Sequence, residues 1–273
     1  MQVDLGVLGP GPGGYTAAFR AADLGLKVAL VERDPNLGGV CLNVGCIPSK
    51  ALLHAAKVIS EARDMSAHGI TFGEPQIDLG QLIGWKDKVV GQLTGGLSAL
   101  AKQRKVEVVE GYGTFASPTQ LRVNSASGQT EIDFKYAIVA AGSEPVQLPG
   151  FPNDDPRLID STGALSLTQV PNRMLVIGGG IIGLEMATVY MELGAEVTVV
   201  ELLDGLMVGA DRDLVKPLEK RLKKRLAGVY TGTRVTQVEA TPEALIAHFD
   251  GGSAPASAPY DVVIVAVGRQ ANG

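Results

Sequence analysis

The sequence predicts an α/β protein with two doubly wound parallel-sheet domains, each carrying a small antiparallel β layer. The 273 residues are 45% hydrophobic and 19% charged and include 35 glycines, a composition typical of a globular chain with many tight turns. One plan of strand, glycine-rich turn, helix and strand occurs twice, about 170 positions apart. A chain of this length suits one large domain or two medium ones.

The first repeat opens the chain, and its turn carries Gly9, Gly11 and Gly14 in Gly-x-Gly-x-x-Gly spacing. The second repeat has the same spacing in Gly178, Gly180 and Gly183. The predicted elements of the first are a strand over 3–8, a helix over 15–24, a strand over 27–31 and then Glu32. Those of the second are a strand over 174–177, a helix over 184–193, a strand over 196–200 and then Glu201.

This spacing is typical of a dinucleotide site. The first glycine permits the tight turn, the second lets the backbone approach a pyrophosphate, and the third lets the helix pack closely on the strand. The helix N-terminus offers free N–H groups to the phosphates, and the acid accepts hydrogen bonds from ribose hydroxyls. A plain glycine turn is the alternative for one such motif, but two motifs with strand, helix and acid in register favour dinucleotide binding.

Between the repeats the pattern predicts two amphipathic helices, over 51–65 and 85–103. Residues 106–109, 121–124 and 131–134 are predicted as short antiparallel strands, and the apolar run 136–141 as a buried strand. Residues 147–171 are rich in proline and turn formers, which indicates a crossover between domains. We therefore predict a first nucleotide-binding domain over 1–149 and a second over 150–270.

The C-terminal part is predicted to add strands over 235–239, 244–249 and 261–267. The last two strands are joined by residues 250–259, whose composition indicates a flexible hairpin loop. The basic run 216–225 is interpreted as the solvated face of a helix.

Both cysteines, Cys41 and Cys46, lie directly after the first repeat. A disulfide closing so short a loop constrains the unfolded chain little, and a chain with its own core needs no such staple. Thiol–disulfide exchange needs one accessible sulfur and one resolving partner, so a close pair beside a dinucleotide site predicts redox chemistry. The alternative is two buried structural thiols.

Charge and hydropathy exclude several classes of function. The net charge of −5 gives no general attraction to nucleic acid or to an anionic membrane. No apolar run reaches the roughly 18 residues that a membrane-spanning helix needs, and no secretory leader is recognised. No metal site is predicted. The expected compartment is the cytoplasm, or the mitochondrial matrix if a presequence was removed.

The residues 41–50, the glycine motif on either side and the segment 140–143 together resemble the flavin-dependent pyridine nucleotide-disulfide oxidoreductases. Within them, Leu42, Ile47 and Ser49 fit the form of the cysteine motif found in the dihydrolipoamide dehydrogenases. The segments 93–97, 177–186 and 205–211 are also similar to that group.

The resemblance implies FAD on the first turn with Glu32 and NAD on the second with Glu201. No arginine lies between positions 202 and 208 to hold a 2′-phosphate, which favours NAD over NADP. It implies that Cys41 exchanges with the substrate dithiol, that Cys46 contacts the flavin as a thiolate, and that Lys50 lies near the flavin and pairs with Glu185. Further cofactor contacts are implied for Gly113, Ala141, Gly142, Ser143 and Gly268.

The implied activity is oxidation of dihydrolipoamide with reduction of NAD, the partners being lipoyl groups of 2-oxo acid dehydrogenase complexes. Family members are homodimers and continue with a second flavin-binding segment and an interface domain, neither of which is matched here. We therefore expect a truncated chain with little turnover alone. Another disulfide substrate, or a nucleotide-binding module without catalysis, stays open. Pro10 departs from the small residue usual in the first turn, and its missing N–H could weaken the pyrophosphate cradle.

Overall fold

The computed structural model describes residues 1–273, which form two compact units. The first unit comprises Met1–Pro48, Trp85–Glu144 and Ala271–Gly273, and the second comprises Ser49–Gly84 and Pro145–Gln270. These units differ from the predicted continuous domains because residues 49–84 cluster with the second unit. Leu52 and its neighbours on that stretch pack into the core of the second unit, which explains the difference. No helix combines the length and the apolar character needed to cross a bilayer.

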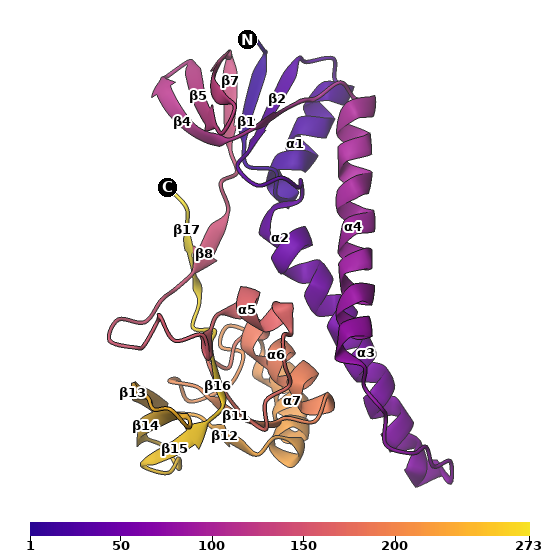
Figure 1. The fold of residues 1–273 in the computed structure, drawn as a ribbon, viewed down its shortest axis with the longest axis vertical. Helices are drawn as coiled ribbons and strands as arrows, with labels where there is room; N and C mark the ends of the chain where they lie inside the picture. The colour runs from indigo at the N-terminus through magenta and orange to yellow at the C-terminus, as the bar shows by residue number, and fades with distance from the viewer. The chain divides into compact units, whose positions relative to one another are not determined.

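The first unit is built on a parallel sheet of order β3-β2-β1-β7 (Figure 1). Its strands are β1 (Leu5–Leu8), β2 (Val28–Glu32), β3 (Glu107–Glu110) and β7 (Tyr136–Val139). Its helices are α1 (Pro12–Asp23) and α2 (Gly39–Val44), with the start of α3 (Cys46–Asp64) and most of α4 (Leu79–Gln103). The doubly wound α/β fold class is therefore confirmed.

Alternate residues of β1 and β2 point to opposite faces of this sheet, and each face has its own core. Leu5, Val7 and Leu30 pack against α1 and α4. Ala29 and Val31 pack against the antiparallel sheet of order β4-β5-β6. That sheet is formed by β4 (Tyr112–Ser117), β5 (Gln120–Ser125) and β6 (Gly128–Asp133). The predicted antiparallel layer thus covers one face and the helices cover the other.

The second unit repeats this three-layer arrangement around a parallel sheet of order β12-β11-β10-β16-β9. Its strands are β9 (Leu158–Ile159), β10 (Arg173–Ile177), β11 (Glu196–Val200), β12 (Gly228–Tyr230) and β16 (Val262–Val265). Its helices include α5 (Ser161–Ser166), α6 (Ile181–Glu192) and α7 (Arg212–Arg225), with the short η1 (Met65–His68) after α3.

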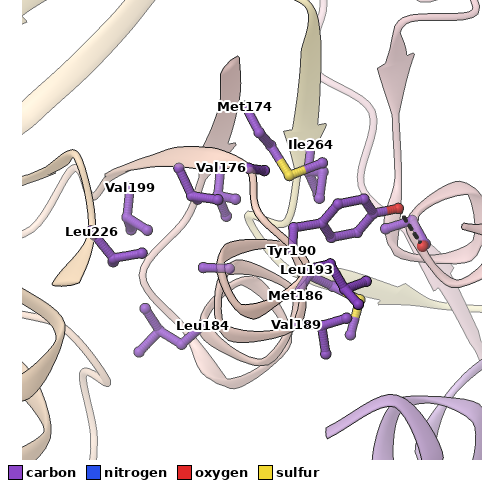
Figure 2. Close-up of a cluster of buried hydrophobic side chains, with 14 of the residues drawn as sticks. Met174, Val176, Leu184, Met186, Val189, Tyr190, Leu193, Val199, Leu226 and Ile264 are labelled. Carbon is purple, nitrogen blue, oxygen red and sulfur yellow. Dashed lines mark hydrogen bonds between the residues drawn. The ribbon is translucent and has the colours of Figure 1, made fainter. Parts of the chain in front are cut away.

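Figure 2 shows how α6 covers the helical face of this sheet. Met174, Val176 and Ile264 project from the strands toward α6, and they are buried in one cluster with Leu184 and Met186 of the helix. The opposite face is covered by the antiparallel sheet of β13 (Thr233–Ala240), β14 (Leu245–Gly251) and β15 (Ser257–Tyr260). A two-stranded sheet joins β8 (Ser143–Pro145) and β17 (Arg269–Ala271).

Two predictions for the first unit are wrong. The strand predicted over 106–109 is β3, which pairs parallel to β2 rather than antiparallel. Only Val109 of its four residues is buried, and β3 is the edge strand of the parallel sheet. The run predicted as a buried strand is β7, whose four residues are all exposed, including Tyr136 at 66% and Val139 at 63%. An apolar run predicts burial only where other elements cover the strand, and β7 lies at the other edge of the sheet.

Two predictions for the second unit need correction. The supposed crossover 147–171 contains β9 and α5, and Asp160 caps α5 by accepting hydrogen bonds from Thr162 and Gly163. The supposed flexible loop 250–259 contains most of β15, which pairs with β14. Both segments are rich in proline, serine or small residues. The turn propensity of these residues favoured a loop prediction where short strands and the helix α5 are formed.

Candidate functional site

The first glycine turn connects β1 to α1 and is tightly packed by its own backbone. Gly9 has φ +98°, and a Cβ there would lie 2.2 Å from the carbonyl oxygen of Ala140. A Cβ on Gly14 would lie 1.7 Å from the carbonyl oxygen of Gly9. A Cβ on Gly11 would meet nothing within 4 Å. The first and third glycines are therefore required by the protein's own packing, and only the second faces open space.

The second turn connects β10 to α6 with the same geometry. Gly178 has φ +112°, and a Cβ there would lie 2.3 Å from the carbonyl oxygen of Ala266. A Cβ on Gly183 would lie 2.1 Å from the carbonyl oxygen of Gly178, whereas one on Gly180 would meet nothing within 4 Å. Both α1 and α6 begin at a glycine without a side-chain cap. Their first N–H groups are therefore available to an anionic ligand beside the open second glycine.

Each acid at the end of the second strand is tied to backbone near its own turn. Glu32 is 8% exposed, and its Oε1 accepts a hydrogen bond from the N–H of Asp34 at 2.8 Å. Oε1 of Glu201 accepts one from Leu203 at 2.9 Å, and its Oε2 accepts one from Gly179 at 2.7 Å. Glu201 is thus held to its glycine turn, whereas Glu32 is held by the segment that follows its own strand; ribose hydroxyls are expected beside such acids.

The segment that follows each acid also forms a backbone hydrogen bond to the turn. The carbonyl oxygen of Pro10 accepts the N–H of Gly38 at 3.0 Å, and that of Gly179 accepts the N–H of Met207 at 2.9 Å. The offset of 169 positions that relates Gly9 to Gly178 also relates Pro10 to Gly179 and Gly38 to Met207. The internal repeat therefore extends beyond the glycine motif to the hydrogen bonds that shape each turn.

A cavity of about 330 Å³ adjoins Glu32 in the first unit. Asp34, Lys102, Glu107 and Glu110 contribute charged side chains to its lining, together with apolar residues from α4 and β3. Burial raises the pKa of Glu32, and the backbone N–H of Asp34 opposes that shift. This cavity has the size of a small-molecule pocket and lies beside the acid of the first turn.

The cysteine segment packs on the first turn through its two glycines. Gly38 and Gly39 have φ +110° and +56°, and a Cβ on Gly39 would lie 2.8 Å from the Cα of Gly11. Cys41 lies on α2 and is partly buried, whereas Cys46 is the first residue of α3 and is exposed. Both cysteines therefore belong to a segment that packs against the first glycine turn.

Asn43, which the sequence analysis did not single out, stabilises that segment. Its side-chain nitrogen donates to the carbonyl oxygens of Leu37 at 3.3 Å and Gly39 at 3.0 Å. These bonds close the turn into α2 from inside. An asparagine midway between two cysteines was the only signal in the sequence that could have indicated this role.

Lys50 and Glu185 lie together in the second unit, as the resemblance implied. The Nζ of Lys50 donates to Oε1 of Glu185 at 2.6 Å. The lysine side chain is 61% exposed and the glutamate 20%, so the pair contributes at most about 1 kcal/mol to stability. The pair, which joins α3 to α6, therefore contributes little to folding.

The other predicted cofactor contacts lie on backbone whose shape is set by packing. Gly113 lies on β4, where a Cβ would be 2.7 Å from a methyl group of Leu8. The carbonyl oxygens of Ala141 and Gly142 accept hydrogen bonds from the side chain and the backbone of Asn272, at 2.8 and 3.0 Å. Ser143 begins β8, and Gly268 precedes β17 with φ +134°.

A buried carboxylate in the second unit was missed entirely. Glu192, at the end of α6, is 1% exposed and forms ion pairs with Arg63 of α3 at 3.3 Å and with Arg225 of α7. The hydroxyl of Ser60 accepts hydrogen bonds from Arg221 and Arg225. The basic run is therefore not simply a solvated face, because two of its arginines join α7 to α3.

Comparison with known proteins agrees with this geometry. The family model described as pyridine nucleotide-disulphide oxidoreductase matches residues 3–273. Dihydrolipoyl dehydrogenases of Vibrio cholerae and Haemophilus influenzae are 55% and 52% identical over 274 residues and cover the whole chain, which spans 58% and 57% of their own length.

Among solved structures, the HOCl-induced flavoprotein disulfide reductase RclA from Escherichia coli matches with a TM-score of 0.83 and 26% identity. Its Cu(II) complex matches with a TM-score of 0.84 and 27% identity, covering 99% of this chain and 57% of that one. The chain belongs to the pyridine nucleotide-disulphide oxidoreductase family.

Proposed function

We propose that this chain is the FAD- and NAD-binding part of a dihydrolipoyl dehydrogenase and carries its redox-active cysteine pair. The observation that carries the proposal is the pair of equivalent glycine turns, with the cysteine segment packed on the first of them. The identity of 55% with a dihydrolipoyl dehydrogenase supports the choice of substrate. The whole protein would oxidise dihydrolipoyl groups of 2-oxo acid dehydrogenase complexes, as a homodimer in the cytoplasm or the mitochondrial matrix.

The residues of the first turn fit FAD. Gly11 leaves open space for the pyrophosphate beside the uncapped start of α1, and Glu32 would accept hydrogen bonds from the ribose. The second turn fits NAD in the same way, through Gly180 and Glu201. Arg212, the arginine nearest this loop in sequence, donates to the carbonyl oxygen of Leu206 at 2.7 Å, which supports NAD over NADP.

When bound, the flavin links a two-electron dithiol to a hydride acceptor, which side chains alone cannot do. In the oxidised protein Cys41 and Cys46 would form a disulfide. One substrate thiol would attack Cys41 and release Cys46 as a thiolate, and the second substrate thiol would then displace Cys41 to close the substrate disulfide. Lys50, held by Glu185, would place its positive charge toward the flavin. The remaining predicted contacts, from Gly113, Ala141–Ser143 and Gly268, would be made by backbone.

Anaerobic reduction of the FAD-loaded chain by NADH, followed by absorbance, tests this assignment of the two turns. Gly14→Ala should abolish FAD binding, because its Cβ would overlap the carbonyl of Gly9. Gly183→Ala should retain FAD but lose reduction by NADH. Gly13→Ala is the matched control, because a Cβ there meets nothing within 4 Å. Loss of FAD in Gly183→Ala with retention in Gly14→Ala would overturn the assignment.

The substrate is tested separately on the protein extended to the full length of its relatives. Dihydrolipoamide should reduce NAD through it, and reduced glutathione should not. Turnover with reduced glutathione at a comparable rate would contradict the proposed substrate while leaving the cofactor assignment intact.

A further inference from the structure

The two glycine turns differ in one hydrogen bond between the turn and its acid. In the second turn, the N–H of Gly179 donates to Oε2 of Glu201 at 2.7 Å. The corresponding residue of the first turn is Pro10, which has no N–H. Oε2 of Glu32 therefore lacks the backbone donor that its counterpart has, although the remaining bonds of the two turns correspond.

The carboxylate of Glu32 receives no hydrogen bond from the first turn, and it borders a cavity. The buried side-chain nitrogens and oxygens without a hydrogen-bond partner are the Nε of Arg104 and the Nε2 of His248, so Oε2 of Glu32 is not such an atom. Glu32 lines the cavity of about 330 Å³ at the end of β2. Glu32 is 8% exposed, and the rest of the cavity lining comes from residues 34–37, α4, β3 and Val106, so the carboxylate borders open space at the end of its strand.

We propose that Pro10 is a positioning residue, which leaves one oxygen of the Glu32 carboxylate available to the ribose hydroxyls of the bound nucleotide. This inference rests on the proposed function, because it needs a nucleotide in the first turn. From the sequence alone, the missing N–H indicated a weaker pyrophosphate turn. In this proposal it instead keeps the Glu32 carboxylate free of the turn and directed toward the ligand. In the second turn, the ribose would share Glu201 with Gly179.

The titration of Glu32 gives this proposal a measurable consequence. Burial raises the pKa of Glu32, while the N–H groups of Asp34 and Arg33 and the charge of Arg33 oppose the shift. Besides Asp34, the charged groups lining its cavity are Lys102 on α4 and Glu107 and Glu110 on β3. Hydroxyl donors favour the ionised carboxylate, so nucleotide binding should strengthen as pH rises through the raised pKa of Glu32.

Pro10→Ala restores the missing N–H, and the position has no positive φ that would disfavour alanine. Pro12→Ala is the matched control, because it restores an N–H in the same turn at the exposed first residue of α1. Carboxyl ¹³C NMR of the chain without nucleotide should show the pKa of Glu32 lowered in Pro10→Ala and unchanged in Pro12→Ala. Equal Glu32 titrations in the wild type and Pro10→Ala would overturn the proposal.

The second measurement compares ADP with its 2′,3′-dideoxy analogue as probes of the first turn, in a Gly183→Ala background that blocks the second. A hydrogen bond to a charged group corresponds to a preference of roughly 10- to 100-fold for ADP. Pro10→Ala should reduce this preference several-fold, whereas Pro12→Ala should keep it. The same preference in Pro10→Ala would contradict the role of Pro10. Absence of ADP binding to the protein with Pro10 intact would instead contradict the proposed function, and the NMR titration would still decide whether Pro10 controls Glu32.

Discussion

The buried carboxylate of Glu192 should be among the most sensitive features of the second unit. Its side chain is 1% exposed, whereas those of its partners Arg63 and Arg225 are 39% and 27% exposed. Replacing both arginines with methionine would leave a buried charge without compensation. Removing the partners of a buried charge destabilises proteins by about 3–5 kcal/mol, and we expect this cost for the double variant.

Adding Glu192→Met to that double variant should recover most of the loss. The triple variant has no buried charge, and methionine fills irregular space in a core well. Replacing a buried ion pair or triad with apolar residues is often neutral or stabilising, so we expect a stability within about 1–2 kcal/mol of the wild type. The recovery separates the effect of charge from the effect of lost arginine packing.

Urea unfolding followed by circular dichroism measures these differences, and hydrogen exchange of the α6 amides localises them to the second unit. The matched control is Lys57→Met with Lys223→Met, which removes the same charge from α3 and α7. Lys57 is exposed, Lys223 is half exposed, and each pairs four residues along its own helix, so the control should cost less than about 1 kcal/mol. A triple variant as unstable as the double one would refute the electrostatic explanation.

Four further outcomes follow from the contacts of Tyr190, Asn43 and Arg157. Burial raises the pKa of Tyr190 to about 12, above its value of 10.0 in the unfolded chain. The free energy of unfolding should therefore decrease as pH rises from 10 toward 12, and urea titrations at alkaline pH should show that Tyr190→Phe lacks this decrease. At neutral pH the same variant should cost about 1 kcal/mol, because the carbonyl of Ala164 loses its 2.7 Å hydrogen bond. Asn43→Ala should increase the rate at which the cysteines react with a thiol reagent, since two bonds that close their turn are lost. The hydrogen bond from Arg157 lowers the pKa of Asp155 below its usual value of 3.8. The stability that this pair contributes should therefore be lost as pH drops below 3.8, and Arg157→Met should show a weaker loss in acid unfolding curves.

The glycine turns were predictable because their geometry is dictated locally. Gly9 and Gly178 need positive φ and a close approach to a neighbouring strand, and no other residue type meets both demands. The acids Glu32 and Glu201 follow at a fixed spacing, because one helix and one strand of fixed rise separate them from the turn. The glycine and acid positions predicted from the motif are therefore the positions at which the structure forms the turn in both repeats.

The missed features depend on contacts between residues distant in sequence. Glu192 is buried because α3 and α7 bring arginines to it from 129 and 33 positions away, which no local pattern records. The parallel pairing of β3 depends on the long helical connection that precedes it, not on its own four residues. The exposure of β7 likewise depends on its place at the sheet edge rather than on its apolar composition.

The most direct test of the central claim is a visible absorption spectrum of the chain mixed with FAD, recorded before and after one equivalent of dithiothreitol. We predict a bound-flavin spectrum that gains a long-wavelength charge-transfer band on reduction, and this band should be retained in Cys41→Ser and lost in Cys46→Ser. A chain that fails to bind FAD, or a band that survives Cys46→Ser, would contradict the assignment of the first turn and its cysteine pair.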